Sequence, residues 1–498
     1  MKFPDHENDL LVIGGGINGA AVALMAAGMG KKVALVEKGD FASGTSSKST
    51  KLIHGGLRYL ENLDFGLVKE ALKERFIQLK NVAHLVNPLQ FIIPVYRDDP
   101  RPLWLVKCGV WLYDFLSGPY AIQKHRVLSA DEVASYLPGI KRDGLVGGVM
   151  YLDAQMDDAR LCLENILSAR EKGAKVANYT EVVSLLKEKG RCVGVEAMDV
   201  ATKEKSVLRA KQVVCSVGPW SNRLKQLDCP GAPDQLRTTK GVHVVYRERI
   251  SDRAMLLQVK ADRRIFFVIP WMGHSLIGTT DTDYQGDLDQ VRVEQEDVDY
   301  LFQELRRVFP NNNFTKENIL CTFAGLRPLV FDHGDPSRLS RQHVIEKSPS
   351  GIVYILGGKY TTYRSIAWQC LRKLGYPVID QGVDYPLYGS GPLKEVPELL
   401  AARYDIDVET VFHLRNKYGI RYRAVLELVA ADPQGKELIC PFAPDIRAQI
   451  VYAIKMEMAR TTEDIYWRRL GLGYRGCDLG ECRRIIEPYL VKYKEGVS

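Results

Sequence analysis

Three glycines near the N-terminus have the spacing of a nucleotide-binding turn. Gly14, Gly16 and Gly19 form G-x-G-x-x-G after an apolar run at residues 9–13, and a second apolar run ends in an acid, Glu37. Glycines let the backbone approach a pyrophosphate at a helix N-terminus, and the acid can accept hydrogen bonds from a ribose. The pattern predicts dinucleotide binding, and Glu37 argues against the 2′-phosphate of NADP.

A hydroxyl-rich loop after Glu37 favours FAD over NAD. Residues 45–51 read TSSKSTK and lead into the paired glycines Gly55 and Gly56. An NAD domain would normally continue into another helix and strand. A flavin instead needs donors for its phosphates and close backbone approach to its flat ring. We therefore expect non-covalent FAD.

At these residues the chain resembles FAD-dependent glycerol-3-phosphate dehydrogenases of the respiratory, quinone-linked type. The resemblance covers residues 8–370 well and the tail more loosely. Its motifs are GGGINGA at 14–20, TSSKSTKLIHGGLRYLE at 45–61, IPW at 269–271, IGTTD at 277–281, GLRPL at 325–329 and GGKYTTYR at 357–364. It implies oxidation of sn-glycerol 3-phosphate to dihydroxyacetone phosphate by hydride transfer from C2 to FAD N5. The electrons would then pass to a membrane quinone.

The resemblance also assigns residues to the substrate. Glycerol 3-phosphate is a small dianion, so its site needs donors for the phosphate and a group that accepts the C2 hydroxyl proton. Arg58 and Arg327 match the family's phosphate-contacting arginines, and a guanidinium fork suits phosphate oxygens. Tyr59 and Thr279 match further substrate contacts.

Three residues are candidates for the catalytic proton transfer, namely His54, Lys359 and Arg341. His54 precedes the first glycine pair, and Lys359 follows the second at the start of a predicted helix. Arg341 matches by its distance along the alignment more than by a motif. The sequence alone does not decide which of them removes the proton.

Cofactor contacts come from the glycine motif, the hydroxyl-rich loop and the matched segments. Val182 fits the segment along the adenine, and Gly218 lies in a small-residue turn that returns to the cofactor. The predicted set is Gly14, Gly15, Gly16, Asn18, Gly19, Glu37, Thr45, Ser46, Ser47, Leu52, His54, Gly55, Gly56, Val182, Gly218, Gly325, Gly358, Lys359, Tyr360 and Thr361.

The elements around these residues predict an α/β fold. It would have a Rossmann-type FAD-binding domain with an inserted antiparallel β-sheet substrate domain, plus a C-terminal α-helical domain. We expect interleaved FAD-binding and substrate domains over 1–389 and the helical domain over 390–498. The FAD part would take about 1–90, 145–230 and 320–380, and the substrate part about 89–145 and 231–320.

Three local predictions depend on periodicity and proline. A helix is expected over 65–86, and a strand over 89–96 is expected at a sheet edge because it contains Pro94. The apolar, aromatic helix over 103–116 is interpreted as a buried core helix slightly ahead of one that dips into a membrane.

Composition excludes several classes of protein. The net charge of +7 is spread along the chain without a basic patch interleaved with aromatics, so nucleic-acid binding is not expected. Ten cysteines without a C-x-x-C pair favour reduced thiols and predict neither a disulfide framework nor a metal site. No apolar run reaches the ~18 residues that span a bilayer. We expect a cytoplasmic enzyme, peripheral to the inner face of the cell membrane, and a homodimer is compatible with the helical domain.

Alternatives stay open at this point. One is an FAD-dependent glycerophosphate oxidase, although the extra segment of such oxidases is missing between Arg327 and Gly357, which are about thirty residues apart. A second is an amine or amino-acid oxidase of the same fold, which would not need Arg58 and Arg327 together. A third is a non-catalytic nucleotide-binding scaffold, which the hydroxyl-rich loop and the two glycine pairs disfavour.

Overall fold

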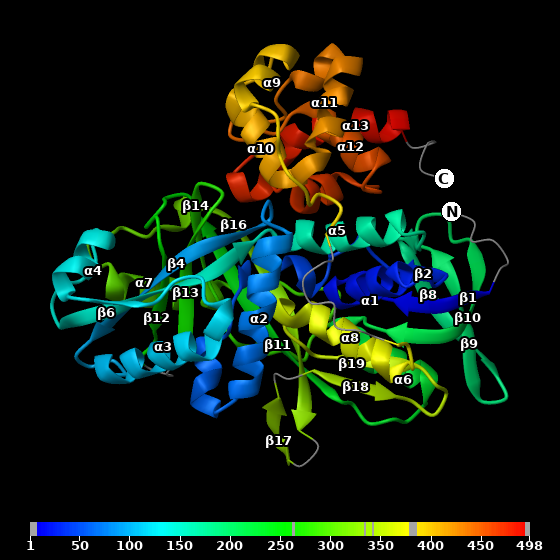
Figure 1. The fold of residues 1–498 in the computed structure, drawn as a ribbon, viewed down its shortest axis with the longest axis horizontal. Helices are drawn as coiled ribbons and strands as arrows, with labels where there is room; N and C mark the ends of the chain where they lie inside the picture. The colour runs from blue at the N-terminus through cyan, green and yellow to red at the C-terminus, as the bar shows by residue number, and fades with distance from the viewer. Residues whose placement is uncertain (1–6, 261–263, 333–334, 341–342, 378–385, 494–498) are drawn as a thin grey trace.

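The computed structural model describes residues 7–260, 264–332, 335–340, 343–377 and 386–493. The described chain forms two large sheets that lie side by side, and a cluster of helices packs above them (Figure 1). The predicted α/β fold with a C-terminal helical part is confirmed. The exact domain limits given above stay a prediction.

The first sheet carries the glycine motif. Within the described residues it has eight strands, and its parallel core runs in the order β19-β10-β1-β2-β7, as in nucleotide-binding folds. An antiparallel strand, β18, closes one edge, and β8 and β9 extend β10 as an antiparallel ribbon. The strands are β1 Asn8–Ile13, β2 Val33–Val36, β7 Lys175–Ala177, β8 Thr180–Glu188, β9 Arg191–Asp199, β10 Lys205–Cys215, β18 Val344–Lys347 and β19 Val353–Leu356.

The second sheet is mostly antiparallel. Eleven strands of the described chain take part, and β11 pairs with β14 on one side and β16 on the other. The strands are β3 Leu52–Ile53, β4 Val86–Tyr96, β5 Arg126–Leu128, β6 Leu145–Met156, β11 Leu236–Tyr246, β12 Ala254–Gln258, β13 Ile265–Trp271, β14 His274–Gly278, β15 Thr282–Asp283, β16 Ile319–Asp332 and β17 Asp335–Ser340.

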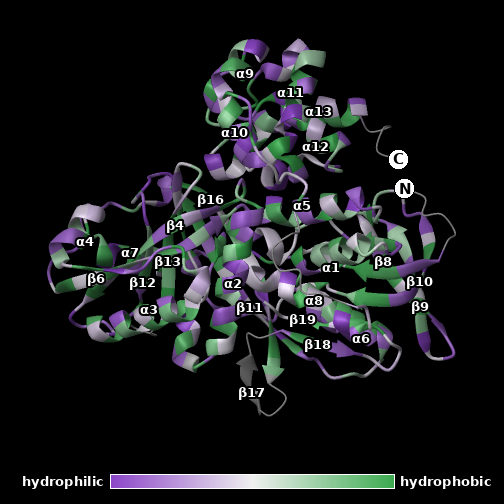
Figure 2. Cartoon of the chain, in the orientation of Figure 1, coloured by the Kyte–Doolittle hydropathy of each residue, from purple (hydrophilic) through white to green (hydrophobic). Residues whose placement is uncertain are grey.

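Helices cover both sheets and join them. Helix α1 is buried along nearly its whole length because it packs against α5 and α8, and it appears mainly apolar in Figure 2. Asp157 caps the start of α5, since its side chain accepts from the Arg160 amide at 3.1 Å. The helices of this part are α1 Ile17–Gly28, α2 Phe65–Asn81, α3 Leu103–Ser117, α4 Ala130–Tyr136, α5 Asp158–Glu171, α6 Ser221–Asp228, α7 Gln295–Val308 and α8 Tyr363–Lys373.

The C-terminal helices sit on the nucleotide-binding part through buried ion pairs. Arg469, in a π-helical turn at Asp464–Arg469, donates to both oxygens of Asp40 at 2.7 and 2.8 Å. Arg160 of α5 pairs with Glu457 at 2.6 Å. Since Asp40 follows Glu37 closely, these helices also hold the loop beside the predicted ribose contact. The helices are α9 Pro397–Tyr404, α10 Val408–Tyr418, α11 Tyr422–Ala431, α12 Arg447–Lys455 and α13 Leu479–Tyr493.

Two local predictions were wrong in their details. Helix α2 ends at Asn81 and not near Val86, where β4 already begins. Strand β4 is not an edge strand, because it pairs with β6 along its length and with β12 at Phe91 and Ile92. Pro94 is tolerated because it lies beyond this short contact with β12.

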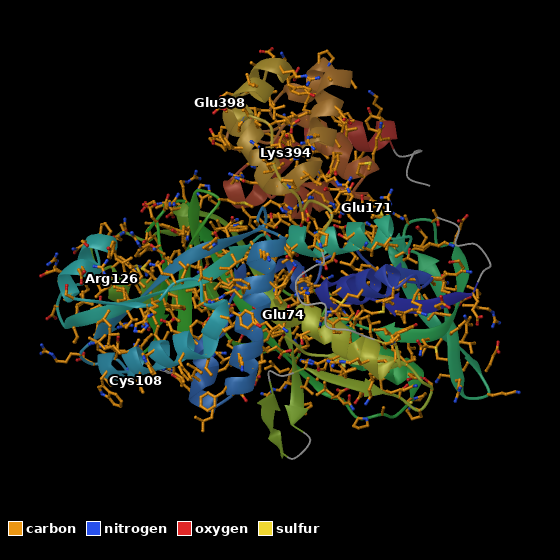
Figure 3. The ribbon with its side chains drawn as sticks, viewed as in Figure 1. Glu74, Cys108, Arg126, Glu171, Lys394 and Glu398 are labelled. Atoms are coloured by element: carbon orange, nitrogen blue, oxygen red, sulfur yellow. A yellow bond between two sulfur atoms is a disulfide. The ribbon has the colours of Figure 1, made fainter. Side chains whose placement is uncertain are left out.

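The interpretation of α3 as a core helix was also wrong. Trp104, Trp111 and Phe115 are 66%, 59% and 69% exposed, whereas Val110 and Tyr113 are buried. The helix is apolar on both faces, and composition does not tell which face meets solvent. Figure 3 shows Cys108 of this helix at the periphery of the molecule. No helix of the described chain is long and apolar enough to cross a bilayer.

The cysteine prediction needs a correction as well. Cys440 and Cys477 form a disulfide, with their Cα atoms 6.1 Å apart. Both belong to one buried apolar cluster of the C-terminal helices. Their sequence separation of 37 residues gave no spacing signal, because packing of distant segments brings them together.

Candidate active site

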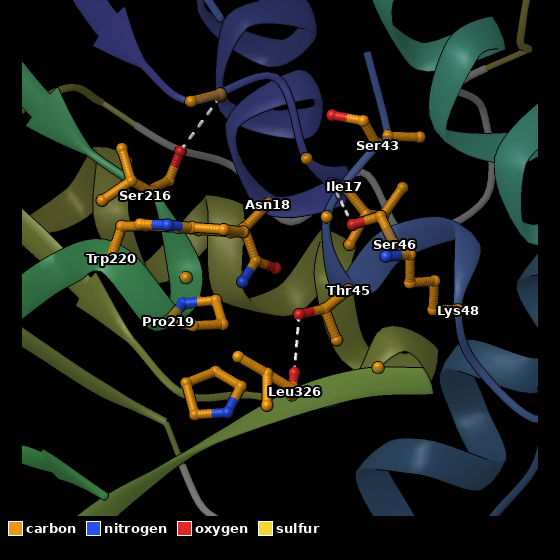
Figure 4. A pocket seen from close by; sticks show the side chains of 18 of the residues that line it. Ile17, Asn18, Ser43, Thr45, Ser46, Lys48, Ser216, Pro219, Trp220 and Leu326 are labelled. Carbon is orange, nitrogen blue, oxygen red and sulfur yellow. Dashed lines mark hydrogen bonds between the residues drawn. The ribbon is translucent and has the colours of Figure 1, made fainter. Parts of the chain in front are cut away.

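One large cavity lies where the two sheets meet. Its volume is about 770 Å³, and its wall combines the glycine motif, the hydroxyl-rich loop, β11, β16 and the turn before α8. Ser43, Thr45, Ser46 and Lys48 face Ser216, Pro219 and Trp220 across it, with Asn18 between them (Figure 4). Many predicted contacts line it, namely Gly14, Gly16, Asn18, Glu37, Thr45, Ser46, Leu52, His54, Tyr59, Val182, Gly218, Gly325, Arg327, Gly358, Lys359, Tyr360 and Thr361.

The glycine motif makes a cradle at the N-terminus of α1. Gly14 has φ +108°, and a Cβ there would lie 2.7 Å from the Ser216 carbonyl oxygen. A Cβ on Gly19 would lie 2.0 Å from the Gly14 oxygen, so Gly19 supports the turn from outside the cavity. Ser46 Oγ accepts from the Ile17 amide at 3.0 Å (Figure 4). A pyrophosphate placed here would meet backbone amides at a helix N-terminus.

The carboxylate of Glu37 is held in a position from which it can accept hydrogen bonds from a ribose. Its two carboxylate oxygens accept from the amides of Gly15 at 2.7 Å and Gly39 at 2.9 Å. Burial raises the pKa of Glu37, and the two amide hydrogen bonds oppose that shift. Each oxygen keeps accepting capacity toward the cavity, where ribose hydroxyls can donate.

Two buried polar atoms at the cavity wall fit a bound group. Asn18 Oδ1 and Lys359 Nζ make no hydrogen bond to any residue that the structure describes. Gly358, with φ +101°, brings the turn before α8 within reach of Asn18. The residues present therefore fit a flavin dinucleotide that extends from Glu37 to Lys359.

Cationic side chains gather around Tyr59 beside His54. Lys359 Nζ lies 3.2 Å from the centre of the Tyr59 ring, and the Arg58 guanidinium lies 6.0 Å from it. Burial, opposed by Asp64 and assisted by Arg58, lowers the pKa of Lys359 to about 7. Burial also lowers the pKa of His54, so that its imidazole is neutral at pH 7. This end of the cavity offers positive charge and a neutral proton acceptor.

Arg327 is held by the turn after β14. Its Nη1 donates to Asp281 at 2.9 Å and its Nη2 donates to Thr279 Oγ1 at 2.8 Å. The Thr279 hydroxyl in turn donates to the Thr280 carbonyl, and Thr279 is not part of the cavity wall. The structure thus places Thr279 behind Arg327, where it orients the guanidinium.

Several other predicted residues lie just outside the wall. Gly55 donates its amide to the Tyr113 hydroxyl at 2.8 Å, and Gly56, with φ +74°, lets the Tyr59 ring lie close. The Ser47 carbonyl accepts from Lys51 at 2.7 Å. Gly15 and Arg58 are also absent from the wall, and Arg341 lies outside the described residues.

Sequence reasoning missed Gly241 and His243 of β11. A Cβ on Gly241 would lie 2.3 Å from Arg327 Nη2, so this glycine makes room for the guanidinium. His243 Nε2 forms a hydrogen bond with the Thr50 hydroxyl at 3.0 Å, and its ring stacks on Phe323. Burial lowers the pKa of His243 well below its usual value. A glycine inside a strand signals close approach, and that signal was available in the sequence.

Comparison with known proteins agrees with this geometry. The family model described as "FAD dependent oxidoreductase" matches residues 9–364, and "C-terminal domain of alpha-glycerophosphate oxidase" matches 381–482. The chain is 38% identical to a glycerol-3-phosphate dehydrogenase of Synechocystis sp., covering 96% of this chain and 92% of that protein. It is 36% identical to the aerobic glycerol-3-phosphate dehydrogenase of Bacillus subtilis, over 93% and 87% of the two chains.

The chain belongs to the FAD-dependent glycerol-3-phosphate dehydrogenase family. A solved glycerol-3-phosphate dehydrogenase of Bacillus halodurans, complexed with FAD, superimposes with a TM-score of 0.77 at 30% identity, over 99% and 90% of the two chains. An L-alpha-glycerophosphate oxidase of Mycoplasma pneumoniae shares the fold at 18% identity, with a TM-score of 0.60 over 78% of this chain and all of that one. The predicted family, enzyme class and cofactor are therefore confirmed. FAD supplies the redox chemistry that side chains cannot, and the cradle at α1 fits this cofactor.

Proposed function

We propose that the protein oxidises sn-glycerol 3-phosphate to dihydroxyacetone phosphate, with hydride transfer from C2 to N5 of FAD. The observation that carries the proposal is the group of three cations, Arg58, Arg327 and Lys359, around Tyr59 and beside the neutral His54. Such a group suits a small phosphorylated alcohol, because Arg327 and Lys359, which line the cavity, can hold the phosphate while Arg58 adds positive charge nearby and the imidazole accepts the hydroxyl proton. Arg341 stays a predicted substrate-side residue.

Anaerobic mixing of the FAD-loaded protein with candidate substrates tests the proposal. Glycerol 3-phosphate should bleach the flavin absorbance, whereas glycerol, glycine and proline should not.

In Arg327→Ala the concentration for half-maximal bleaching should rise at least about tenfold, since a desolvated charged hydrogen bond is lost. Arg237→Ala is the control, because Arg237 pairs with Asp283 and does not line the cavity. Bleaching by the amino acids, or unchanged affinity in Arg327→Ala, would contradict it.

Lys359 should give the reaction an alkaline limit near neutral pH. Its pKa of about 7 means that the free enzyme loses this ammonium charge as the pH rises past 7. Because the charged form holds the phosphate dianion, we expect kcat/KM to fall above pH 7. In Lys359→Arg the side chain stays charged, so this decline should disappear even if the absolute rate is lower. Steady-state kinetics from pH 6 to 9 measure it, and the same decline in both proteins would refute the role of Lys359.

We further propose that electrons leave to a quinone at the inner face of the cell membrane, and that α3 contacts the bilayer from the cytoplasmic side. Trp104, Trp111 and Phe115 form an exposed aromatic surface on α3. Leu63, between the neighbouring Leu57–Asn62 turn and α2, is 71% exposed beside it. Aromatic rings suit the membrane interface, and this surface lies far from the C-terminal helices in Figure 1. A homodimer stays a prediction.

Flotation with anionic liposomes at low salt tests the contact. The wild type should float, and a Trp104→Glu, Trp111→Glu variant should remain at the bottom while still loaded with FAD, because two charges replace the exposed rings that would insert into the lipid. The matched control is Leu399→Glu, Phe442→Glu, which alters apolar residues of the C-terminal helices that are 70% and 69% exposed. Flotation that is lost only in the control would move the contact to the C-terminal helices.

A further inference from the structure

A segment of the second sheet crosses over the cavity to the nucleotide-binding part. Residues 284–294 connect β15 to α7 and are tethered at both ends. The Tyr284 amide donates to the Thr238 carbonyl at 3.0 Å, and Lys240 pairs with the buried Asp297 in the first turn of α7 at 2.7 Å. Between these tethers, Leu288, Asp289 and Val291 line the cavity.

Asp289 joins this segment to two places in the nucleotide-binding part. Its Oδ1 accepts from Lys38 Nζ at 2.5 Å and from the Trp220 indole at 2.9 Å, and its Oδ2 accepts from Arg223 at 2.7 Å. Arg223 also donates to Asp287 at 3.0 Å. The Asp289 carboxylate thus accepts from the neutral Trp220 indole and from the cations Lys38 and Arg223. The Asp287 carboxylate also accepts from Arg223.

The donors surround the end of the cavity that receives the adenosine half of the cofactor. Lys38 directly follows Glu37, and all three donors line the cavity together with Val182. The Trp220 ring is contacted on two sides. Lys38 Nζ lies 4.3 Å from the ring centre, and Gly44 lies so close that a Cβ there would be 3.2 Å from the ring atom Cζ3. Asp289 therefore fixes the aromatic wall of this end as well as the segment over it.

We propose that Asp289 is an electrostatic latch that holds residues 284–294 over the adenosine end, and that FAD enters and leaves when this latch opens. The ion pairs are partly open to water, because the side chains of Lys38, Asp289 and Arg223 are 36%, 40% and 53% exposed. A single exposed ion pair contributes little stability. Here, however, three donors from separate parts of the nucleotide-binding part bind one carboxylate together. Since exposed charges are screened, salt should loosen the latch. The proposal does not depend on which substrate the enzyme oxidises.

Release of FAD from the loaded enzyme tests the latch. After dilution, free-FAD fluorescence should rise at least about five times as fast in Asp289→Asn as in the wild type. The isosteric amide is uncharged, so it cannot form ion pairs with Lys38 and Arg223. Raising the ionic strength from about 0.02 to 0.5 M should accelerate release in the wild type and have a smaller effect in Asp289→Asn. Substrate turnover is not needed for either measurement.

The control is Asp283→Asn, which removes a similarly exposed partner of Arg237 in β15, directly before the segment and away from the cavity. It should release FAD at the wild-type rate. Arg223→Gln, at an exposed position, is a second test variant and should also accelerate release. The proposal is overturned if Asp289→Asn and Arg223→Gln release FAD within twofold of the wild type, or if Asp283→Asn is as fast as they are.

Discussion

Replacement of His54 by asparagine is expected to lower kcat by two to four orders of magnitude, the usual contribution of a positioned general base. Burial lowers the pKa of His54, and Lys359, Arg58 and Arg75 lower it further against the opposing effect of Asp153. The imidazole is thus a neutral acceptor beside three cations. Asparagine keeps the approximate size of the ring but cannot take up a proton.

Stopped-flow reduction of the flavin by glycerol 3-phosphate measures this effect, because it isolates the chemical step from the later transfer to an acceptor. The acid decline of kcat/KM, which reports protonation of His54 below its lowered pKa, should vanish in the variant. His274→Asn is the control, since His274 lies outside the cavity wall and contacts the Arg247 carbonyl. A reduction rate within about fivefold of the wild type would move the proton transfer to another residue.

Local sequence patterns identified several residues that the structure brings together at one end of the cavity. Gly14, Gly16 and Glu37 all line it, because a strand, a tight turn and a helix within one short segment determine their positions. Predictions of this kind depend on backbone geometry that a few neighbouring residues already specify.

Features built from distant segments could not be predicted in this way. Cys440 and Cys477 meet only through packing of the C-terminal helices, and Asp289 meets Lys38 and Trp220 only because the second sheet lies against the first. The sequence showed each residue as an ordinary member of its own segment. Tertiary packing decides which of them become neighbours.

Helix α3 shows a second limit. Its composition is equally compatible with a buried helix and with an exposed aromatic surface, since hydrophobic content does not record what lies on either side. The structure resolves the choice because α2 and β6 pack against α3, whose Val110 and Tyr113 are buried, while its Trp104 and Trp111 are mostly exposed. Contiguous exposed apolar surface is typical of interaction sites.

Replacement of Gly14 by valine should abolish FAD binding, the largest effect that we expect. With φ at +108°, Gly14 adopts a backbone conformation that L-residues rarely take, and a Cβ would lie 2.7 Å from the Ser216 carbonyl oxygen. The branched side chain would therefore push the turn away from the backbone after β10 and distort the cradle in which the pyrophosphate would lie at α1. The purified variant should be colourless.

The FAD released on denaturation, measured per mole of protein, decides the result. Gly66→Ala is the control, because a Cβ at Gly66 meets no atom within 4 Å. Gly16→Ala provides a graded case, since its Cβ would contact the movable Ser46 Oγ at 3.1 Å, so this variant should bind FAD more weakly and not lose it. If Gly14→Val is folded and retains a full complement of FAD, the pyrophosphate does not lie at this turn. Release of NAD by the wild type would instead contradict the assignment of FAD as the cofactor. Loss of FAD in Gly14→Val together with partial loss in Gly16→Ala would locate it there, because the two substitutions obstruct the same cradle to different extents.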